Sequence, residues 1–193
     1  PIVSLDPAIS GLGAMHGTYR HIYDALVFRD ANSQPIPGLA ESWRVLDPLT
    51  WEFNLRRGVV CHDGTPLDAS DVSATFRRLP TVTGSDLLTV SKMRPVTRIE
   101  VVDSHTLRFH TREPYPGLLV ALPEFHIVCD SVPANATTED FNTGRAAIGS
   151  GPYRHVSWER GARWELERND QWWGERPYFR RVTQREIGPD APR

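Results

Sequence analysis

Residues 43–55, WRVLDPLTWEFNL, indicate most directly how this chain folds. Apolar side chains alternate with polar ones on both sides of a turn at residues 47–50. A period of two is typical of half-buried antiparallel strands, so the stretch predicts a β-hairpin. The same alternation predicts two further hairpins, at 99–109 and at 153–168.

Helices are predicted before the first hairpin and between the hairpins. Apolar residues at helical spacing predict a helix over 14–26. A capping-box pattern at 68–71 predicts a short helix that Pro80 ends. A strand is expected at 126–129, whereas residues 81–95 read as polar and irregular.

The last part of the chain adds short elements. A helical turn is expected to carry Trp172 and Trp173, and residues 179–187 predict a closing strand. The order of strands, helices and hairpins is that of a mixed α/β (α+β) chain. Residues 41–147 are expected to form an insertion between two pieces of one domain.

The composition is that of a globular protein. The 193 residues are 39% hydrophobic and 24% charged, which suits one large domain or two small ones with a hydrophobic core. The formal net charge of -2 gives no basic field, so no nucleic-acid partner is expected. No apolar run approaches the roughly 20 residues of a membrane helix.

Cys61 and Cys129 leave two alternatives open. They have no CxxC spacing and match no metal-finger pattern. They could pair in an oxidising compartment, but a disulfide needs a geometry that the sequence does not give. We expect two buried free thiols in preference to a disulfide.

No catalytic residue, metal site or cofactor is predicted. The run Cys61-His62-Asp63 offers a nucleophile, a base and an acid, but neighbours on a strand point to opposite faces and cannot form a relay. The histidine pairs at 16 and 21 and at 105 and 110 do not have the spacing of zinc ligands. A Gly-rich phosphate loop and a G-x-S-x-G elbow are both absent from the sequence.

Several short strings along the chain resemble one protein family. They are SLDP at 4–7, YDAL at 23–26, PGLAESW at 37–43, FNLRRG at 53–58, HDGTPLDASDV at 62–72, GSGPY at 149–153 and WG at 173–174. In this order they resemble the family 5 extracellular solute-binding proteins, which include dipeptide, oligopeptide and nickel binders. Cys61 stands where the family usually has an aromatic residue, and Ser150 replaces a threonine.

The resemblance implies a type II periplasmic-binding-protein-like fold with two lobes. Residues 1–40 and 148–193 would be parts of the first lobe, and 41–147 its inserted α+β subdomain. The second lobe would be absent from this chain. A targeting segment is expected to have been removed before Pro1.

The implied function is that of the extracytoplasmic solute-binding component of an ABC importer. Such a component captures peptides or similar small solutes in a cleft between the lobes and delivers them to the membrane permease. The expected partners are a small-molecule or short-peptide ligand and the permease. The expected location is periplasmic or otherwise extracytoplasmic, with membrane contact only through the permease or a lipid anchor. A ligand-sensing or interaction module derived from a binding-protein lobe is the alternative.

Two glycine-bearing loops, at 10–18 and 149–153, are the predicted ligand contacts, because glycine lets backbone groups approach a ligand. The resemblance places both loops near the cleft. The candidate side chains in the first loop are Met15, His16 and Tyr19. Met15 and Tyr19 equally suit the packed face of a helix.

Ser150 and Gly151 are the candidates in the second loop. Arg145 is a further candidate, because a guanidinium can hold a ligand carboxylate in a bidentate contact. A solvated arginine on the surface is the alternative for Arg145.

Overall fold

Three antiparallel sheets form the framework of the computed structural model, which describes residues 1–9, 13–85 and 87–186. A small sheet pairs β1 (Val27–Arg29) with β2 (Pro35–Pro37). The largest sheet has the strand order β3 (Ala40–Asp47), β4 (Thr50–Leu55), β6 (Thr106–Thr111) and β5 (Val96–Asp103). The third sheet holds β7 (Tyr153–Glu159), β8 (Arg163–Arg168) and β9 (Arg181–Arg185).

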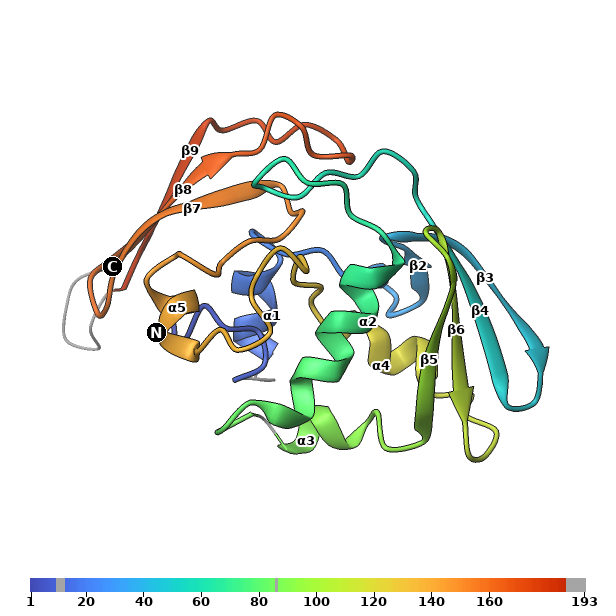
Figure 1. Ribbon diagram of the computed structural model, residues 1–193. Helices are drawn as coiled ribbons and strands as arrows, with labels where there is room; N and C mark the ends of the chain where they lie inside the picture. The colour runs from blue at the N-terminus through green and yellow to red at the C-terminus, as the bar shows by residue number, and fades with distance from the viewer. Residues whose placement is uncertain (10–12, 86, 187–193) are drawn as a thin grey trace.

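Short helices lie between the sheets (Figure 1). They are α1 (Gly13–Tyr19), α2 (Ala69–Arg78), α3 (Leu87–Ser91), α4 (Leu118–Ala121) and α5 (Thr138–Asn142), with 3-10 turns at Leu79–Thr81 and Leu122–Glu124.

The predicted capping box at the start of α2 is confirmed. The Asp68 carboxylate accepts the backbone N–H of Ser70 at 2.7 Å, and the Asp71 carboxylate accepts that of Asp68 at 2.7 Å. Two N–H groups that the helix itself cannot pair are satisfied in this way. The α-helix passes into a 3-10 turn at Pro80, which has no N–H to donate.

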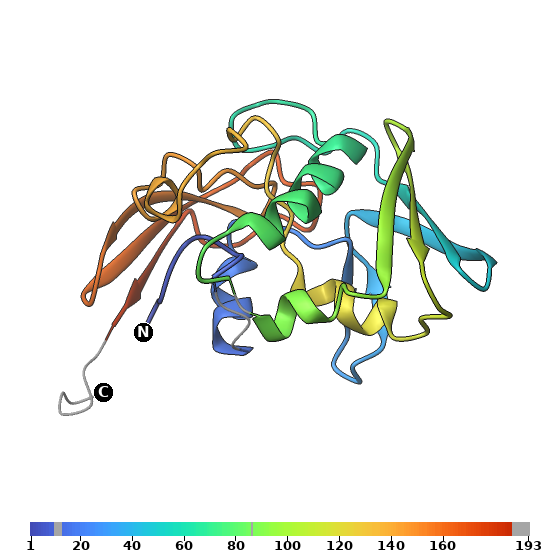
Figure 2. The ribbon, with the colours of Figure 1, turned by 60° about the horizontal axis from the view of Figure 1, so that its bottom comes forward.

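The two larger sheets lie at opposite sides of the molecule, with helices between them (Figures 1 and 2). One core cluster packs the largest sheet against α2 and α4 and includes the buried Phe53 and Phe109. A second cluster packs α1 and α5 against β7 and β8 and includes the buried Tyr19 and Trp164. The mixed α/β fold class predicted from the sequence is confirmed.

All three predicted hairpins are confirmed, as β3–β4, β5–β6 and β7–β8. In the first, Trp43 lies opposite Phe53, so two aromatic side chains meet across the strands. The predicted closing strand is β9, which pairs with β8.

The helix predicted over 14–26 is too long, because α1 ends at Tyr19. The backbone that follows is used in tertiary pairing: the carbonyls of His21 and Ile22 accept the N–H groups of Tyr153 and Gly151, each at 2.8 Å. The pairing partners lie about 130 residues away in sequence, so helical spacing alone could not reveal them.

Three other local predictions are wrong. A short helix, α3, forms within the segment 81–95 that was expected to be irregular. The expected strand at 126–129 is reduced to one β-bridge, between Ala25 and His126. Trp172 lies in irregular backbone and Trp173 on a bend, not on a helical turn.

The expectation of free thiols is also wrong, because Cys61 and Cys129 form a disulfide. The two residues are 68 positions apart and are both buried. Backbone hydrogen bonds beside the disulfide join both cysteine segments to the loop at 148–149. His62 N–H donates to the Gly149 carbonyl at 2.8 Å, and Cys129 N–H donates to that of Ile148 at 3.1 Å. Only the folded arrangement of three distant segments brings the sulfurs together.

The domain boundaries stay a prediction. The strands β4 to β6, and β3 except for its first residue Ala40, fall within 41–147, and β7 to β9 fall after it. The core clusters, however, cross the expected boundary: Val128 and Phe141 pack in the cluster of α1 and β8, and Leu26 packs in the cluster of the largest sheet.

Among the described residues, none of the helices combines the length and the apolar character that crossing a membrane requires.

Candidate functional site

The two loops predicted from the sequence come together through their backbones. Gly151 N–H donates to the carbonyl of Ile22, just beyond α1, at 2.8 Å. A Cβ atom at Gly151 would lie 2.5 Å from the carbonyl carbon of Ile22, and one at Gly149 would lie 2.4 Å from the Ile22 oxygen. Glycine is therefore required at both positions. Residues 10–12 of the first loop lie outside the described residues.

Asp24 is a buried carboxylate that ties the second loop to the tryptophan pair. The Ser150 hydroxyl donates to Asp24 at 2.8 Å, and the indole N–H groups of Trp173 and Trp172 donate at 2.9 and 3.3 Å. Burial raises the pKa of Asp24, and these hydrogen bonds oppose the shift. The Ser150 side chain thus serves to hold its loop in place.

The carbonyl of Gly151 also helps to hold this loop in place. That oxygen accepts hydrogen bonds from His62 Nε2 and from Asn169 Nδ2, both at 3.0 Å. Burial lowers the pKa of His62 to about 4, so its imidazole is neutral at pH 7. The neutral ring donates from Nε2 here, which assigns its tautomer.

Two guanidiniums and two aromatic rings form a ladder of contacts beside Asp24, whose carboxylate accepts the Trp173 indole N–H. The Arg20 guanidinium lies 4.7 Å from the centroid of the Phe28 ring, which stacks on Trp173 with 6.5 Å between centroids. The Arg56 guanidinium lies 4.4 Å from the centroid of the Trp173 ring. Cation–π contacts of this kind fix the rings in orientation. The ladder therefore presents a rigid aromatic and cationic surface next to α1.

Met15 and Tyr19 lie in the core cluster of α1 and β8 and are 3% and 1% exposed. The Tyr19 hydroxyl donates to the carbonyl of Asp6 at 3.1 Å, and burial raises the pKa of Tyr19 well above its usual value. In this chain both side chains pack the helix face. Their contact with a ligand stays a prediction.

His16 is half-buried and stacks on the ring of His126, with 5.4 Å between centroids. The Tyr19 ring meets His126 edge-on at the same distance. Arg20, the residue after α1, is exposed, and its positive charge helps to lower the pKa of His126. The first predicted loop thus leads into a cluster of three rings and one guanidinium.

His126 is a candidate site residue that sequence reasoning missed. It is 3% exposed, and neither ring nitrogen has a hydrogen-bond partner among the described residues. Burial, with the nearby charges of His16 and Arg20, lowers its pKa to about 3, so the ring is neutral. A neutral imidazole offers one donor and one acceptor to a ligand. A signal existed in the sequence, since this histidine interrupts an apolar run at 125–129.

Arg145 forms its ion pair outside this cluster of rings. Its guanidinium pairs with the Asp140 carboxylate of α5, and its side chain is 75% exposed. The Asp140 carboxylate also caps α5 by accepting the backbone N–H of Thr137 at 2.8 Å. Binding of a ligand carboxylate by Arg145 stays a prediction.

A buried ion pair anchors the segment that precedes α1. Arg78, at the end of α2, donates to both oxygens of Asp6, at 2.9 and 2.7 Å. Asp6 is fully buried, and its Oδ1 also accepts the backbone N–H of Ala8 at 3.1 Å. A bidentate contact of this kind fixes orientation as well as distance. The segment that precedes the first loop is thereby held against α2.

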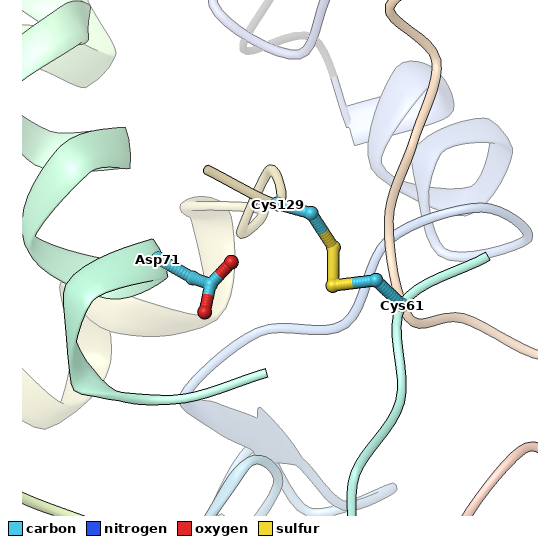
Figure 3. A group of neighbouring side chains, drawn as sticks. All are labelled: Cys61, Asp71 and Cys129. Carbon is cyan, nitrogen blue, oxygen red and sulfur yellow. A yellow bond between two sulfur atoms is a disulfide. The ribbon is translucent and has the colours of Figure 1, made fainter. Parts of the chain in front are cut away.

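Cys61, Asp71 and Cys129 form the one group of three potential metal ligands among the described residues, with their ligand atoms within 4.8 Å of one another (Figure 3). The two sulfurs are bonded to each other, so neither is a thiolate. The Asp71 oxygens accept the N–H groups of Asp68 and Asp130, at 2.7 and 2.8 Å. In this form the group is a structural junction.

Comparison with known proteins gives the chain a family. The family model described as "Bacterial extracellular solute-binding proteins, family 5 Middle" matches residues 34–193. The probable D,D-dipeptide-binding periplasmic protein DdpA of Escherichia coli (strain K12) is 28% identical over 98% of this chain and 38% of its own length. The periplasmic oligopeptide-binding protein OppA of Salmonella typhimurium (strain LT2) is 27% identical over 89% of this chain and 35% of its own.

Solved structures agree in fold. The periplasmic binding protein DppA of Helicobacter pylori, in complex with the peptide STSA, superposes with a TM-score of 0.85 at 25% identity over 96% of this chain and 41% of that one. NikA of Brucella suis, in complex with Fe(III)-EDTA, gives a TM-score of 0.82 at 27% identity over 96% and 37%.

The chain thus spans little more than a third of the length of these relatives. Its mixed α/β structure corresponds to one part of type II periplasmic binding proteins, as expected for a piece of their first lobe. The chain belongs to family 5 of the bacterial extracellular solute-binding proteins.

Proposed function

We propose that this chain is part of the solute-binding component of an ABC importer. In this proposal the whole protein captures peptides or similar small solutes in a cleft between two lobes and delivers them to the membrane permease. The observation that carries the proposal is the superposition of nearly the whole chain on a peptide-bound relative, at a TM-score of 0.85. The curated relatives named above are likewise named as dipeptide- and oligopeptide-binding proteins.

The proposed contribution of this chain to the cleft is a preformed surface beside α1. His16 supplies an imidazole that stacks on the neutral ring of His126, and Arg20 supplies a positive charge. Met15 and Tyr19 support the helix that carries them. Ser150 and Gly151 would present the second loop to the ligand through its backbone, and Arg145 remains the proposed contact for a carboxylate.

An extracytoplasmic location is part of the proposal. The relatives are named periplasmic, and the buried disulfide fits a compartment in which disulfides form and persist. Contact with the membrane would come through the permease or a lipid anchor.

Binding without catalysis is also part of the proposal. Cys61 is bonded to Cys129 and cannot act as a nucleophile in this form. The relatives that are compared above are binding proteins by name.

Deletion of the gene from its host tests the transport role. We expect uptake of labelled short peptides to fall and to return when the gene is restored. Unchanged uptake of peptides, together with unchanged uptake of nickel chelates, sugars and opines, would contradict the proposal and would favour a sensing module.

A further inference from the structure

A cavity of about 460 Å³ lies between α2, α3 and β5, and none of the residues of the surface beside α1 lines it. Figure 1 shows these three elements side by side below and to the right of the centre. Its volume is within the range of small-molecule sites in proteins. The segments 73–80, 90–94 and 96–99 line it.

The floor of the cavity is apolar. Phe76, Val90 and Met93 line it, and all three are only half-buried although they pack against core clusters of the protein. Val96 and Ile99 of β5 close the far wall. An apolar ligand that covered these side chains would remove their remaining surface from water. This burial favours binding by about 25 cal/mol for each Å² of apolar surface that is covered.

The rim of the cavity carries only positive charge. Arg77, Arg94 and Arg98 line it, and none of the described lining residues is acidic. Arg98 already pairs with the Glu100 carboxylate at 2.9 Å. The guanidiniums of Arg77 and Arg94 have no carboxylate partner among the described residues. Two unpaired guanidiniums over an apolar floor suit a ligand with an apolar body and an anionic head.

We propose that this groove is a binding site for a small amphipathic carboxylate. The apolar body lies on Phe76, Val90 and Met93, and the carboxylate accepts hydrogen bonds from Arg77 and Arg94. This site is independent of the proposed cleft beside α1, because it shares no lining residue with that surface.

A small molecule fits this groove better than an added peptide strand. β5 is the edge strand of its sheet, and its residues 96–99 line the groove. The pairing register of β5 shifts between Val96 and Arg98, within the part that lines the cavity. Such an irregularity interrupts the regular row of donors and acceptors that an added strand needs.

Titration calorimetry of the natural protein with octanoate tests the proposal, with 1-octanol as the neutral probe of the same chain length. We expect saturable binding of octanoate and binding of 1-octanol that is about tenfold weaker, because a charge-assisted contact is lost. Arg77→Gln and Arg94→Gln should each weaken octanoate binding by about tenfold for the same reason. Arg57→Gln, an exposed arginine outside the groove, is the matched control and should bind as the wild type does.

A filling variant gives a second readout. Val90→Phe places a larger side chain in the cavity and should reduce the binding of both probes while circular dichroism stays unchanged. Absence of octanoate binding, equal binding of the two probes, or octanoate binding that neither arginine variant weakens would each overturn the proposal.

Discussion

His126 is a buried histidine that the packing of the fold does not explain. A buried polar group without a hydrogen bond destabilises a protein by about 1–3 kcal/mol. We therefore expect His126→Leu, which removes both unpartnered ring nitrogens, to raise the free energy of unfolding by about 1 kcal/mol at pH 7. Urea unfolding of the two proteins measures the difference.

The effect of pH has a definite sign at His126. Its folded pKa of about 3 lies below the usual 6.5, so its contribution to stability is complete above pH 6.5 and is lost as the pH falls toward 3. The advantage of His126→Leu should therefore grow as the pH is lowered from 7 to 4. His155→Leu is the matched control, because His155 accepts the Trp164 indole N–H at 3.0 Å and its loss should destabilise. A destabilised His126→Leu would show that the ring is a packing element.

Asp71 titrates in the opposite sense. Burial raises its pKa from 3.8 to about 6, against the effect of the two N–H groups that it accepts. The stability linked to its proton is complete below pH 3.8 and is lost as the pH rises through 6. The free energy of unfolding of the wild type, measured relative to Asp71→Asn, should fall between pH 4 and pH 7. A difference that stays constant or rises over this interval would contradict the assigned shift.

Sequence patterns predicted the three hairpins and the capped helix α2 correctly, but they predicted the tertiary contacts poorly. The capping box at Asp68 and the alternation around Trp43 are short-range signals, and both are confirmed. The helix over 14–26 failed beyond Tyr19 because the Ile22 carbonyl is used by Gly151. The importance of His126 depends on its contact with α1, which no local pattern contains.

The disulfide joins the segment after β4 to the segment before α5. In the chain-entropy account, closing a loop of 68 residues stabilises the folded state by about 4 kcal/mol. We expect the double variant Cys61→Ala/Cys129→Ala to lose roughly this amount in urea unfolding. The reduced wild type should match it. A loss below about 1 kcal/mol would show that backbone bonds such as His62 to Gly149 already hold the junction.

The molecule as a whole resembles a part of a larger binding protein. Its two core clusters share the segment around Ile148, so the two larger sheets are held to each other through a common hydrophobic junction. The sequence predicted the family and the fold class from strings spread along the chain. The domain boundaries stay a prediction, and Val128 and Phe141, which lie within the predicted insertion, pack in the cluster of α1 and β8.

Contacts from one lobe alone are expected to hold a ligand weakly. Binding has to offset the lost freedom of the ligand, and half of the cleft would be missing from this chain. We expect residues 1–193 alone to bind short peptides more weakly than the micromolar range in calorimetry. Micromolar affinity of the isolated chain would show that its own surface beside α1 forms the complete site.

The proposed transport function depends on the capture of a small solute by the natural protein. Native mass spectrometry of that protein, purified gently from its own host, tests this capture. We expect a retained mass that matches a short peptide or a similar small solute, or a mass shift when such solutes are added. A protein that retains nothing, and whose mass does not shift with peptides, metal chelates, sugars or opines, would contradict it.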